Sequence, residues 1–157
     1  MGIRLYREYE LKFYLNARHY IIIDGRRGDV HPHTWEFSMC IRIGRDAFTP
    51  FMVFEKKVNA LLEPYQNRLL NEVEPFDQIL PTLENMVDYF AQQARDELWR
   101  IGGELIRVEA SETPTRSYIL ELQEGQESER EAEILPKLVD SVLEDILTDL
   151  REQGEPG

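Results

Sequence analysis

Three histidines lie within one short stretch of the chain, and it has no others. His31 and His33 are two residues apart in a segment that alternates between apolar and polar residues, which predicts a β-strand. Side chains two apart on a strand project from the same face, about 6.6 Å apart. His19 ends the preceding predicted strand, which can pair with the second across a loop. Three neutral imidazoles with an open fourth position describe a catalytic type of zinc site; ordinary strand and loop histidines are the alternative.

The elements that must position these histidines follow from hydrophobic periodicity. Alternation predicts strands over residues 5–15, 31–43, 105–112 and 116–122. Spacings of three and four predict helices over residues 53–62, 83–99 and 134–150, and two glycines predict a loop over Asp24–Asp29. Strands and helices that follow one another in blocks favour an α+β fold, an antiparallel sheet with helices on one face. The open edges of four strands could pair with other subunits.

Composition narrows the class of protein. A chain of 157 residues suits one domain, and 42% hydrophobic with 31% charged residues excludes wholesale disorder. No apolar run approaches the roughly 18 residues that span a bilayer, and the first residues do not resemble a secretory signal. A protein with a net charge of −12 is a poor non-specific binder of nucleic acid. Its single cysteine, Cys40, excludes an internal disulfide. We therefore expect a cytoplasmic protein that binds neither nucleic acid nor membrane.

The negative charge is concentrated at the C-terminal end. Residues 121–157 hold 12 acidic and 3 basic side chains, which predicts a domain over 1–122 followed by an acidic linker and an amphipathic helix within 123–157. The helix has an apolar stripe that could pack on its own domain or on a neighbouring subunit. Its acidic outer face could bind a basic partner.

A series of short motifs resembles, in order and spacing, the family of 6-pyruvoyl-tetrahydropterin and 6-carboxy-tetrahydropterin synthases. The motifs are Leu15–His19, His31–His33, Met52–Val53, Leu70–Asn71, Pro81–Asn85, Val108–Thr113 and Tyr118. The resemblance covers residues 5–122 and implies a T-fold, an antiparallel four-stranded sheet with two helices between strands two and three. Such subunits form trimeric barrels, and two trimers stack into a hexamer.

The resemblance also implies roles for particular residues. His19, His31 and His33 would bind zinc, which would hold the side-chain oxygens of a dihydroneopterin triphosphate and acidify the adjacent C–H. Glu112 matches the glutamate that anchors the pterin ring, since a carboxylate suits two parallel N–H donors; a capping or turn carboxylate is the alternative. Thr82 with Glu84 and Asn85 would cap and brace the second helix.

Two departures from the family pattern concern proton transfer. Arg27 occupies the place of the catalytic cysteine, and Gln66–Asn67 occupies that of an Asp-His pair. Neither a guanidinium nor an amide can take up a proton near neutral pH. Asp29 and Glu55 are the nearest substitutes for the base. Arg27 would instead favour binding of a ligand's phosphates, unless it lies in a solvated loop.

The leading hypothesis is therefore a zinc-dependent lyase similar to these synthases, which binds or converts a dihydroneopterin triphosphate-type pterin. A catalytically inactive relative that binds a pterin or nucleotide as a sensor is the main alternative, and an acidic structural oligomer without metal is a third. The pathway stays open among queuosine precursors, tetrahydrobiopterin-like pterins and folate.

Overall fold

The computed structural model describes residues 2–3, 5–44, 49–122, 143–148 and 151. The chain divides into two units, residues 1–122 and 123–157. In the second unit, residues 143–148 are helical, as the sequence predicts for this part of the helix over 134–150. The remaining residues of that predicted helix and its linker lie outside the described part. Among the described residues, no helix has the length and apolar character needed to span a membrane.

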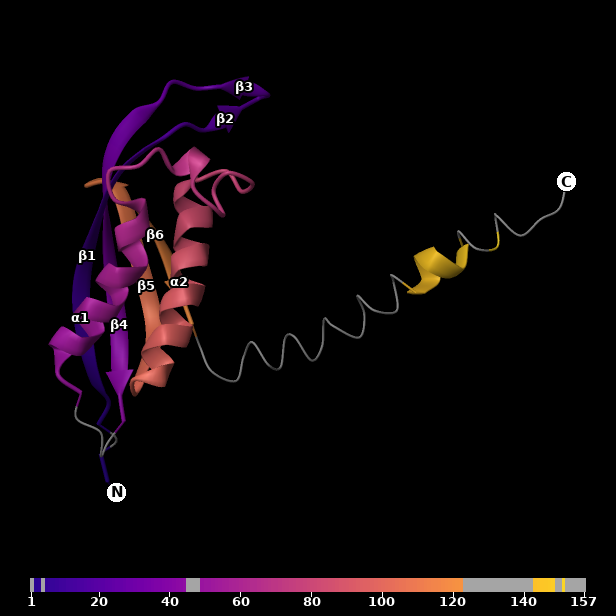
Figure 1. Ribbon diagram of the computed structural model, residues 1–157. Coiled ribbons are helices and arrows are strands. Elements are labelled where there is room, and N and C mark those ends of the chain that lie inside the picture. The colour runs from indigo at the N-terminus through magenta and orange to yellow at the C-terminus, as the bar shows by residue number, and fades with distance from the viewer. Residues whose placement is uncertain (1, 4, 45–48, 123–142, 149–150, 152–157) are drawn as a thin grey trace, which may run out of the picture. The chain divides into compact units, whose positions relative to one another are not determined.

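The first unit is a four-stranded antiparallel sheet covered on one face by two helices (Figure 1). The strands β1, β4, β5 and β6 lie side by side in chain order: Arg7–His19, His31–Ile43, Gly103–Thr113 and Arg116–Glu121. The helices α1 (Phe51–Leu62) and α2 (Leu83–Arg100) connect β4 to β5. This arrangement confirms the α+β T-fold with two helices between the second and third strands of the sheet.

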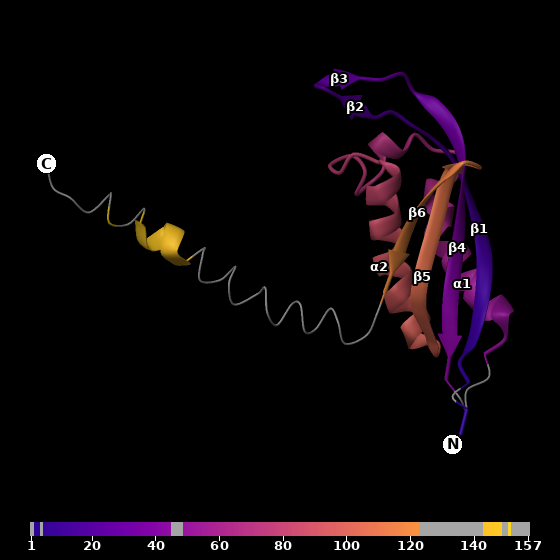
Figure 2. The same cartoon turned by 180° about the vertical axis from the view of Figure 1, so that it is seen from behind.

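The core lies between the sheet and the helices, where the alternating pattern of β4 places Trp35, Phe37, Met39 and Ile41, all fully buried. Helix α2 contributes a buried stripe to the same core, formed by Met86, Val87, Phe90, Ala91, Ala94 and Leu98. The opposite face of the sheet, which Figure 2 turns towards the viewer, carries polar pairs. They include Lys12 with Glu36 at 3.3 Å and Arg42 with Glu8 at 3.0 Å. One face of the sheet is thus apolar and the other polar, as expected when successive side chains of a strand point to opposite faces.

The segment between the first two long strands is not the simple loop that the sequence predicts. It forms a hairpin of two short strands, β2 (Ile22–Ile23) and β3 (Arg26–Arg27), which projects beyond the end of the sheet (Figure 1). Asp24 and Gly25 make its two-residue turn with φ of 51° and 75°. A turn with two positive φ values matches the twist of a hairpin and favours such residues.

Strand β1 also extends beyond its predicted end at Leu15, because the inward alternation continues through Ala17 to His19. Helix α1 begins two residues before its predicted start, directly after Pro50. Two short 3₁₀ turns, Glu63–Tyr65 and Leu70–Glu72, lead from α1 towards α2.

Candidate metal and ligand site

The three histidines meet because of the register between β1 and β4. In this antiparallel pair His19 lies directly opposite His31, and Ala17 lies opposite His33. His33 is two residues along β4 from His31, so it faces the same side of the sheet. Strand alternation and pairing therefore suffice to gather the three imidazoles, as the sequence spacing predicts.

The imidazoles form a compact group of nitrogen atoms. One ring nitrogen from each of His19, His31 and His33 lies within 4.8 Å of the other two. The Nε2 atoms of His19 and His31 are 2.9 Å apart. Zinc–nitrogen bonds of about 2.0–2.1 Å place two nitrogens of a tetrahedral site roughly 3.3 Å apart. The group thus has the dimensions of a metal site after a small adjustment.

Backbone carbonyls fix the tautomers of two of these rings. Nδ1 of His19 lies 2.7 Å from the carbonyl oxygen of Pro81, and Nδ1 of His31 lies 2.9 Å from that of Asp29. A carbonyl only accepts, so each Nδ1 carries the proton and donates. In the neutral rings, both Nε2 lone pairs then face each other, and a cation or an added proton must lie between them. Metal-bound histidines commonly have this outer hydrogen bond to a carbonyl.

Burial favours the neutral, metal-binding form of the histidines. The side chain of His19 is only 2% exposed. Burial lowers the pKa of His19, and His31 lowers it further, against the opposite effect of the hydrogen bond to Pro81. Burial likewise lowers the pKa of His33, although Glu112 acts in the opposite direction. Because two of the three rings resist protonation, the donor set fits a cation better than a shared proton.

Side-chain amides hold the end of β1 that carries His19. The backbone N–H of Tyr20 donates to Oδ1 of Asn71 at 2.9 Å, and Nδ2 of Asn71 donates to the Tyr20 carbonyl at 3.0 Å. Asn71 therefore pairs with the peptide next to His19 as a neighbouring strand would. This contact gives the Leu70–Asn71 motif a positioning role.

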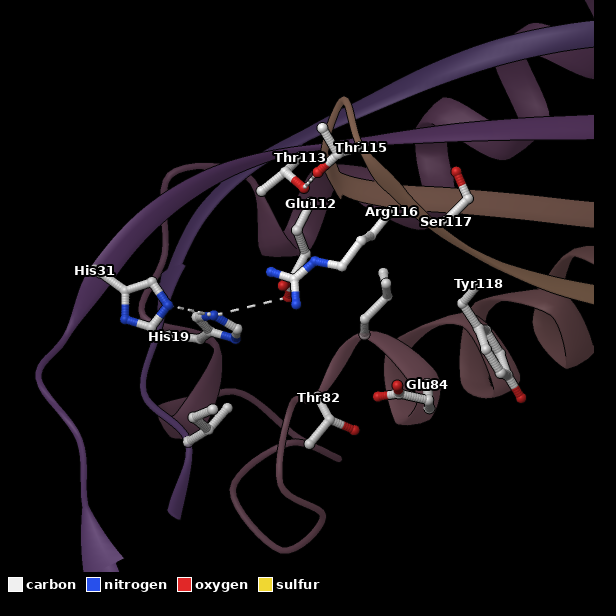
Figure 3. A pocket seen from close by; sticks show the side chains of 12 residues that line it. His19, His31, Thr82, Glu84, Glu112, Thr113, Thr115, Arg116, Ser117 and Tyr118 are labelled. Carbon is white, nitrogen blue, oxygen red and sulfur yellow. Dashed lines mark hydrogen bonds and ion pairs between the residues drawn. The ribbon is translucent and has the colours of Figure 1, made fainter. Parts of the chain in front are cut away.

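A pocket of about 610 Å³ opens beside His19 and His31. Glu112, at the end of β5, lines it, and its Oε1 lies 4.0 Å from Nε2 of His19 (Figure 3). The indole N–H of the fully buried Trp35 donates to the same oxygen at 3.1 Å. The structure thus brings Glu112 next to the histidines and fixes its carboxylate, with lone pairs still available to a ligand.

Thr82, at the start of α2, lines the same pocket and caps the helix, as the sequence predicts. Its Oγ1 accepts a hydrogen bond from the backbone N–H of Asn85, and the Asn85 side chain donates to the Leu80 carbonyl. Glu84 lines the pocket as well. The helix start therefore both braces the fold and borders the site.

Three further residues singled out from the sequence, Arg27, Asp29 and Glu55, are not among those lining this pocket. Arg27 lies in the hairpin with its guanidinium 3.9 Å from the centre of the Tyr20 ring. Asp29 contributes its backbone carbonyl to His31. Glu55 belongs to α1. Asp29 thus reaches the histidines through its backbone, and the roles of the three side chains stay predictions.

Gln66 and Asn67, which replace the family's Asp-His pair, are tied to β1. Oε1 of Gln66 accepts from the Asn16 N–H at 2.9 Å, and Nε2 donates to the Tyr14 carbonyl at 2.8 Å. The Asn67 N–H donates to the Asn16 carbonyl at 2.6 Å. These contacts give the pair a structural role at the strand edge.

Sequence reasoning missed Trp35 and Arg116 as site residues. Trp35 belongs to the apolar face of β4, and only its contact with Glu112 reveals a second role. Arg116 lines the pocket from the start of β6. Its position four residues after Glu112, across a tight turn between two strands, was the available signal.

Comparisons with known proteins agree with this architecture. The family model described as 6-pyruvoyl tetrahydropterin synthase matches residues 8–123. A search of curated proteins gave no match.

Solved structures show the same fold at low sequence identity. The Caenorhabditis elegans 6-pyruvoyl tetrahydropterin synthase is 16% identical, with a TM-score of 0.62 over 78% of this chain and 100% of that one. A Plasmodium vivax 6-pyruvoyltetrahydropterin synthase, solved as a variant of a catalytic glutamate, is 17% identical, with a TM-score of 0.58 over 76% and 99%. An uncharacterized protein from Wolinella succinogenes is 12% identical, with a TM-score of 0.58 over 76% and 100%.

Proposed function

Because this chain belongs to the 6-pyruvoyl tetrahydropterin synthase family, we propose that it binds zinc and a dihydroneopterin triphosphate-type pterin at the histidine pocket. The observation that carries the proposal is the cluster of His19, His31 and His33 beside a pocket that also contains Glu112. A tetrahydropterin synthase-like protein needs a metal and a ring anchor within reach of one substrate.

Zinc is the metal that the donor set supports best. Three neutral imidazoles with an open position suit this ion, and the hydrogen bonds to Pro81 and Asp29 would hold two of the rings in the ligating tautomer. When bound, zinc would polarise the oxygens of the substrate's side chain and acidify the adjacent C–H. The histidines would hold that side chain close to the pocket wall.

Glu112 would anchor the ring. Its carboxylate can accept two parallel N–H donors from the 2-amino group and the neighbouring ring nitrogen of a pterin. The hydrogen bond from Trp35 would keep the carboxylate oriented before the ligand arrives. Such preorganisation reduces the entropy that binding must overcome.

The lyase reaction itself is expected to be slow or absent. General-base catalysis contributes on the order of a hundred- to ten-thousand-fold, and neither Arg27 nor Gln66 can act as a base. The Plasmodium vivax relative has a catalytic glutamate, so a carboxylate can serve in a related protein. Glu84 and Glu112 are the carboxylates that line the pocket here. If any turnover occurs, Glu84 would accept the proton, because Glu112 is committed to the ring.

A second candidate, binding without catalysis as a sensor or partner protein, is favoured by two contacts. The guanidinium of Arg27 stacks on Tyr20, and the amide of Gln66 is committed to β1. Both replaced positions therefore have contacts of their own within the protein. The two candidates share a ligand and differ in turnover.

An oligomer built on trimers, with a hexamer as the full assembly, accords with the exposed strands. β1 and β6 are the two edges of the sheet. The residues of β1 before Tyr14 have backbone groups on the outer edge without a described partner strand. A β6 edge from another copy could pair there.

Elemental analysis and ligand titration test the proposal together. We expect about one zinc per subunit, and the double variant His31→Ala, His33→Ala should lose most of it, while Cys40→Ser should retain it. Pterin fluorescence should report binding that Glu112→Ala weakens. Incubation with dihydroneopterin triphosphate, followed by chromatography for released triphosphate, separates a lyase from a binding protein. Stoichiometric zinc in the double variant, or no pterin binding by the intact protein, would contradict the proposal.

A further inference from the structure

Glu112 and Arg116 lie on either side of the turn between β5 and β6 and face the same side of the sheet. Ala110, opposite Tyr118, faces the buried core. Two residues from Tyr118 towards the turn, alternation keeps Arg116 on the inner face, and the hydrogen bond from the buried Trp35 holds Glu112 on the same side. The register shifts between Ser111 and Thr113, so Glu112 lies at a bulge that re-aims its side chain.

Arg116 is a cation without a partner in this pocket. Of the residues that line the pocket, it is the one arginine or lysine. No hydrogen bond or ion pair joins its guanidinium to another described residue. Figure 3 shows the guanidinium pointing into the pocket, towards the side where Glu112 and His19 lie. Its five N–H donors are therefore available to a ligand.

Glu112 does not neutralise this guanidinium by a direct ion pair within the described part of the chain. Its Oε1 accepts from Trp35 and faces Nε2 of His19 at 4.0 Å. The pocket wall thus presents a carboxylate acceptor and guanidinium donors as two separate groups. A ligand that bridges them needs N–H donors and, on the same edge, a neutral or anionic acceptor.

The ring of a 2-amino-4-oxopteridine has such an edge. Its amino group and ring N–H are donors, and its carbonyl oxygen and the next ring nitrogen are acceptors. An arginine that donates two hydrogen bonds to a carbonyl oxygen and an adjacent ring nitrogen is the commonest specific contact to guanine, which has the same acceptor pair. Glu112 and Arg116 together therefore match both halves of this edge.

We propose that Arg116 donates hydrogen bonds to the carbonyl side of the pterin ring while Glu112 accepts them from the amino side. Arg116 is then a specificity-determining residue. This inference rests on the proposed function, because it presupposes a pterin in the pocket. A site built to donate to a carbonyl rejects an analogue that carries an amino group there, since two donors then oppose each other. Glu112 also loses one donor in such an analogue, because the ring nitrogen beside the new amino group carries no hydrogen. The share of the preference that Arg116 supplies is therefore the share that its replacement removes.

A comparison of two rings tests the role. The affinities of pterin and 2,4-diaminopteridine are measured by fluorescence titration with the full chain, with Arg116→Gln and with Arg100→Gln. Arg100 ends α2, at the opposite end of that helix from Thr82, and serves as the control. We expect the intact chain to prefer pterin by about tenfold or more, Arg100→Gln to retain this preference, and Arg116→Gln to reduce it several-fold.

The outcomes separate this inference from the proposed function. If the intact chain binds pterin and Arg116→Gln retains the full preference, the inference is wrong and the proposed function stands. If Arg116→Gln weakens only dihydroneopterin triphosphate and leaves the unsubstituted ring unaffected, the guanidinium binds phosphates instead, and the inference is again wrong. If the intact chain binds neither ring, both fail together.

Discussion

The indole N–H of Trp35 donates a hydrogen bond of 3.1 Å to the carboxylate of Glu112, although the two residues are 77 positions apart. Trp35 is fully buried in the core, and Glu112 borders the pocket. One contact therefore connects the packing of the sheet to the orientation of the proposed ring anchor. A change in the core beneath the pocket should therefore change the affinity for the ligand.

Replacing Trp35 with Phe tests this connection, because Phe retains an aromatic ring and lacks the N–H. Loss of a hydrogen bond to a charged group should lower the free energy of unfolding by about 1.5–3 kcal/mol, and pterin affinity should fall several-fold. Thermal unfolding and fluorescence titration measure the two effects. Phe37→Leu, a packing change on the same face of β4, should destabilise the protein without weakening the ligand. Unchanged pterin affinity in Trp35→Phe would show that the indole does not orient Glu112.

Asn71→Ala should loosen the end of β1. The variant loses two hydrogen bonds to the Tyr20 peptide, at a cost of about 1–3 kcal/mol of stability. Because His19 precedes that peptide, zinc affinity in a competition with a chelator should fall as well. Asn59→Ala, at an exposed position of α1, is the matched control. A variant that is less stable yet binds zinc as tightly as the intact chain would separate Asn71 from the metal site.

The thiol of Cys40 should react slowly. Burial raises its pKa, and Glu8, whose carboxylate accepts a hydrogen bond from Sγ at 3.7 Å, raises it further. A raised pKa leaves less thiolate at a given pH, so the pH at which alkylation accelerates should lie above that of an unperturbed thiol. Intact mass after iodoacetamide treatment reports one site, since the chain has one cysteine. Glu8→Gln should speed the reaction at pH 8, and an unchanged rate would argue against the role of Glu8.

Arg27→Cys should not restore lyase turnover. The hairpin directs Arg27 onto the Tyr20 ring, and Gln66 and Asn67 remain in place of the Asp-His pair. Release of triphosphate from dihydroneopterin triphosphate should stay far below the median of about ten per second for enzymes. Arg26→Cys, the adjacent hairpin position, controls for adding a thiol. Turnover that appears in Arg27→Cys alone would mean that a thiol there reaches the substrate.

The sequence was sufficient for the features that depend on local periodicity. Alternation along residues 31–43 gave the strand, its buried face and the shared side of His31 and His33. Pairing of His19 with His31 then followed from a short connection between the strands. The apolar spacing of α2 and the cap at Thr82 were equally local.

Features that depend on distant contacts were not predictable in this way. Nothing local to Gln66 indicates that its amide pairs with Tyr14 and Asn16, 50 or more residues earlier. The hairpin was missed because two-residue strands are too short to show alternation. Trp35 carries no signal until the register of the sheet places it beside Glu112, and the signal for Arg116 is only its position four residues after Glu112.

The amide pairing along β1 gives this strand two kinds of backbone N–H on the same edge. The N–H groups of Asn16, Arg18 and Tyr20 donate to Gln66, Arg68 and Asn71. By the same alternation, those of Glu8, Glu10 and Lys12 point outward from the sheet.

Hydrogen-exchange rates should therefore differ between the two halves of β1. The later amides should be slow in any assembly state, whereas the earlier ones should exchange quickly in an isolated subunit and become slow when another copy pairs with the edge. A comparison of the exchange rates at low and high protein concentration would measure the association of subunits directly. β1 thus carries an internal reference at Asn16 and Arg18 and a reporter of association at Glu8, Glu10 and Lys12.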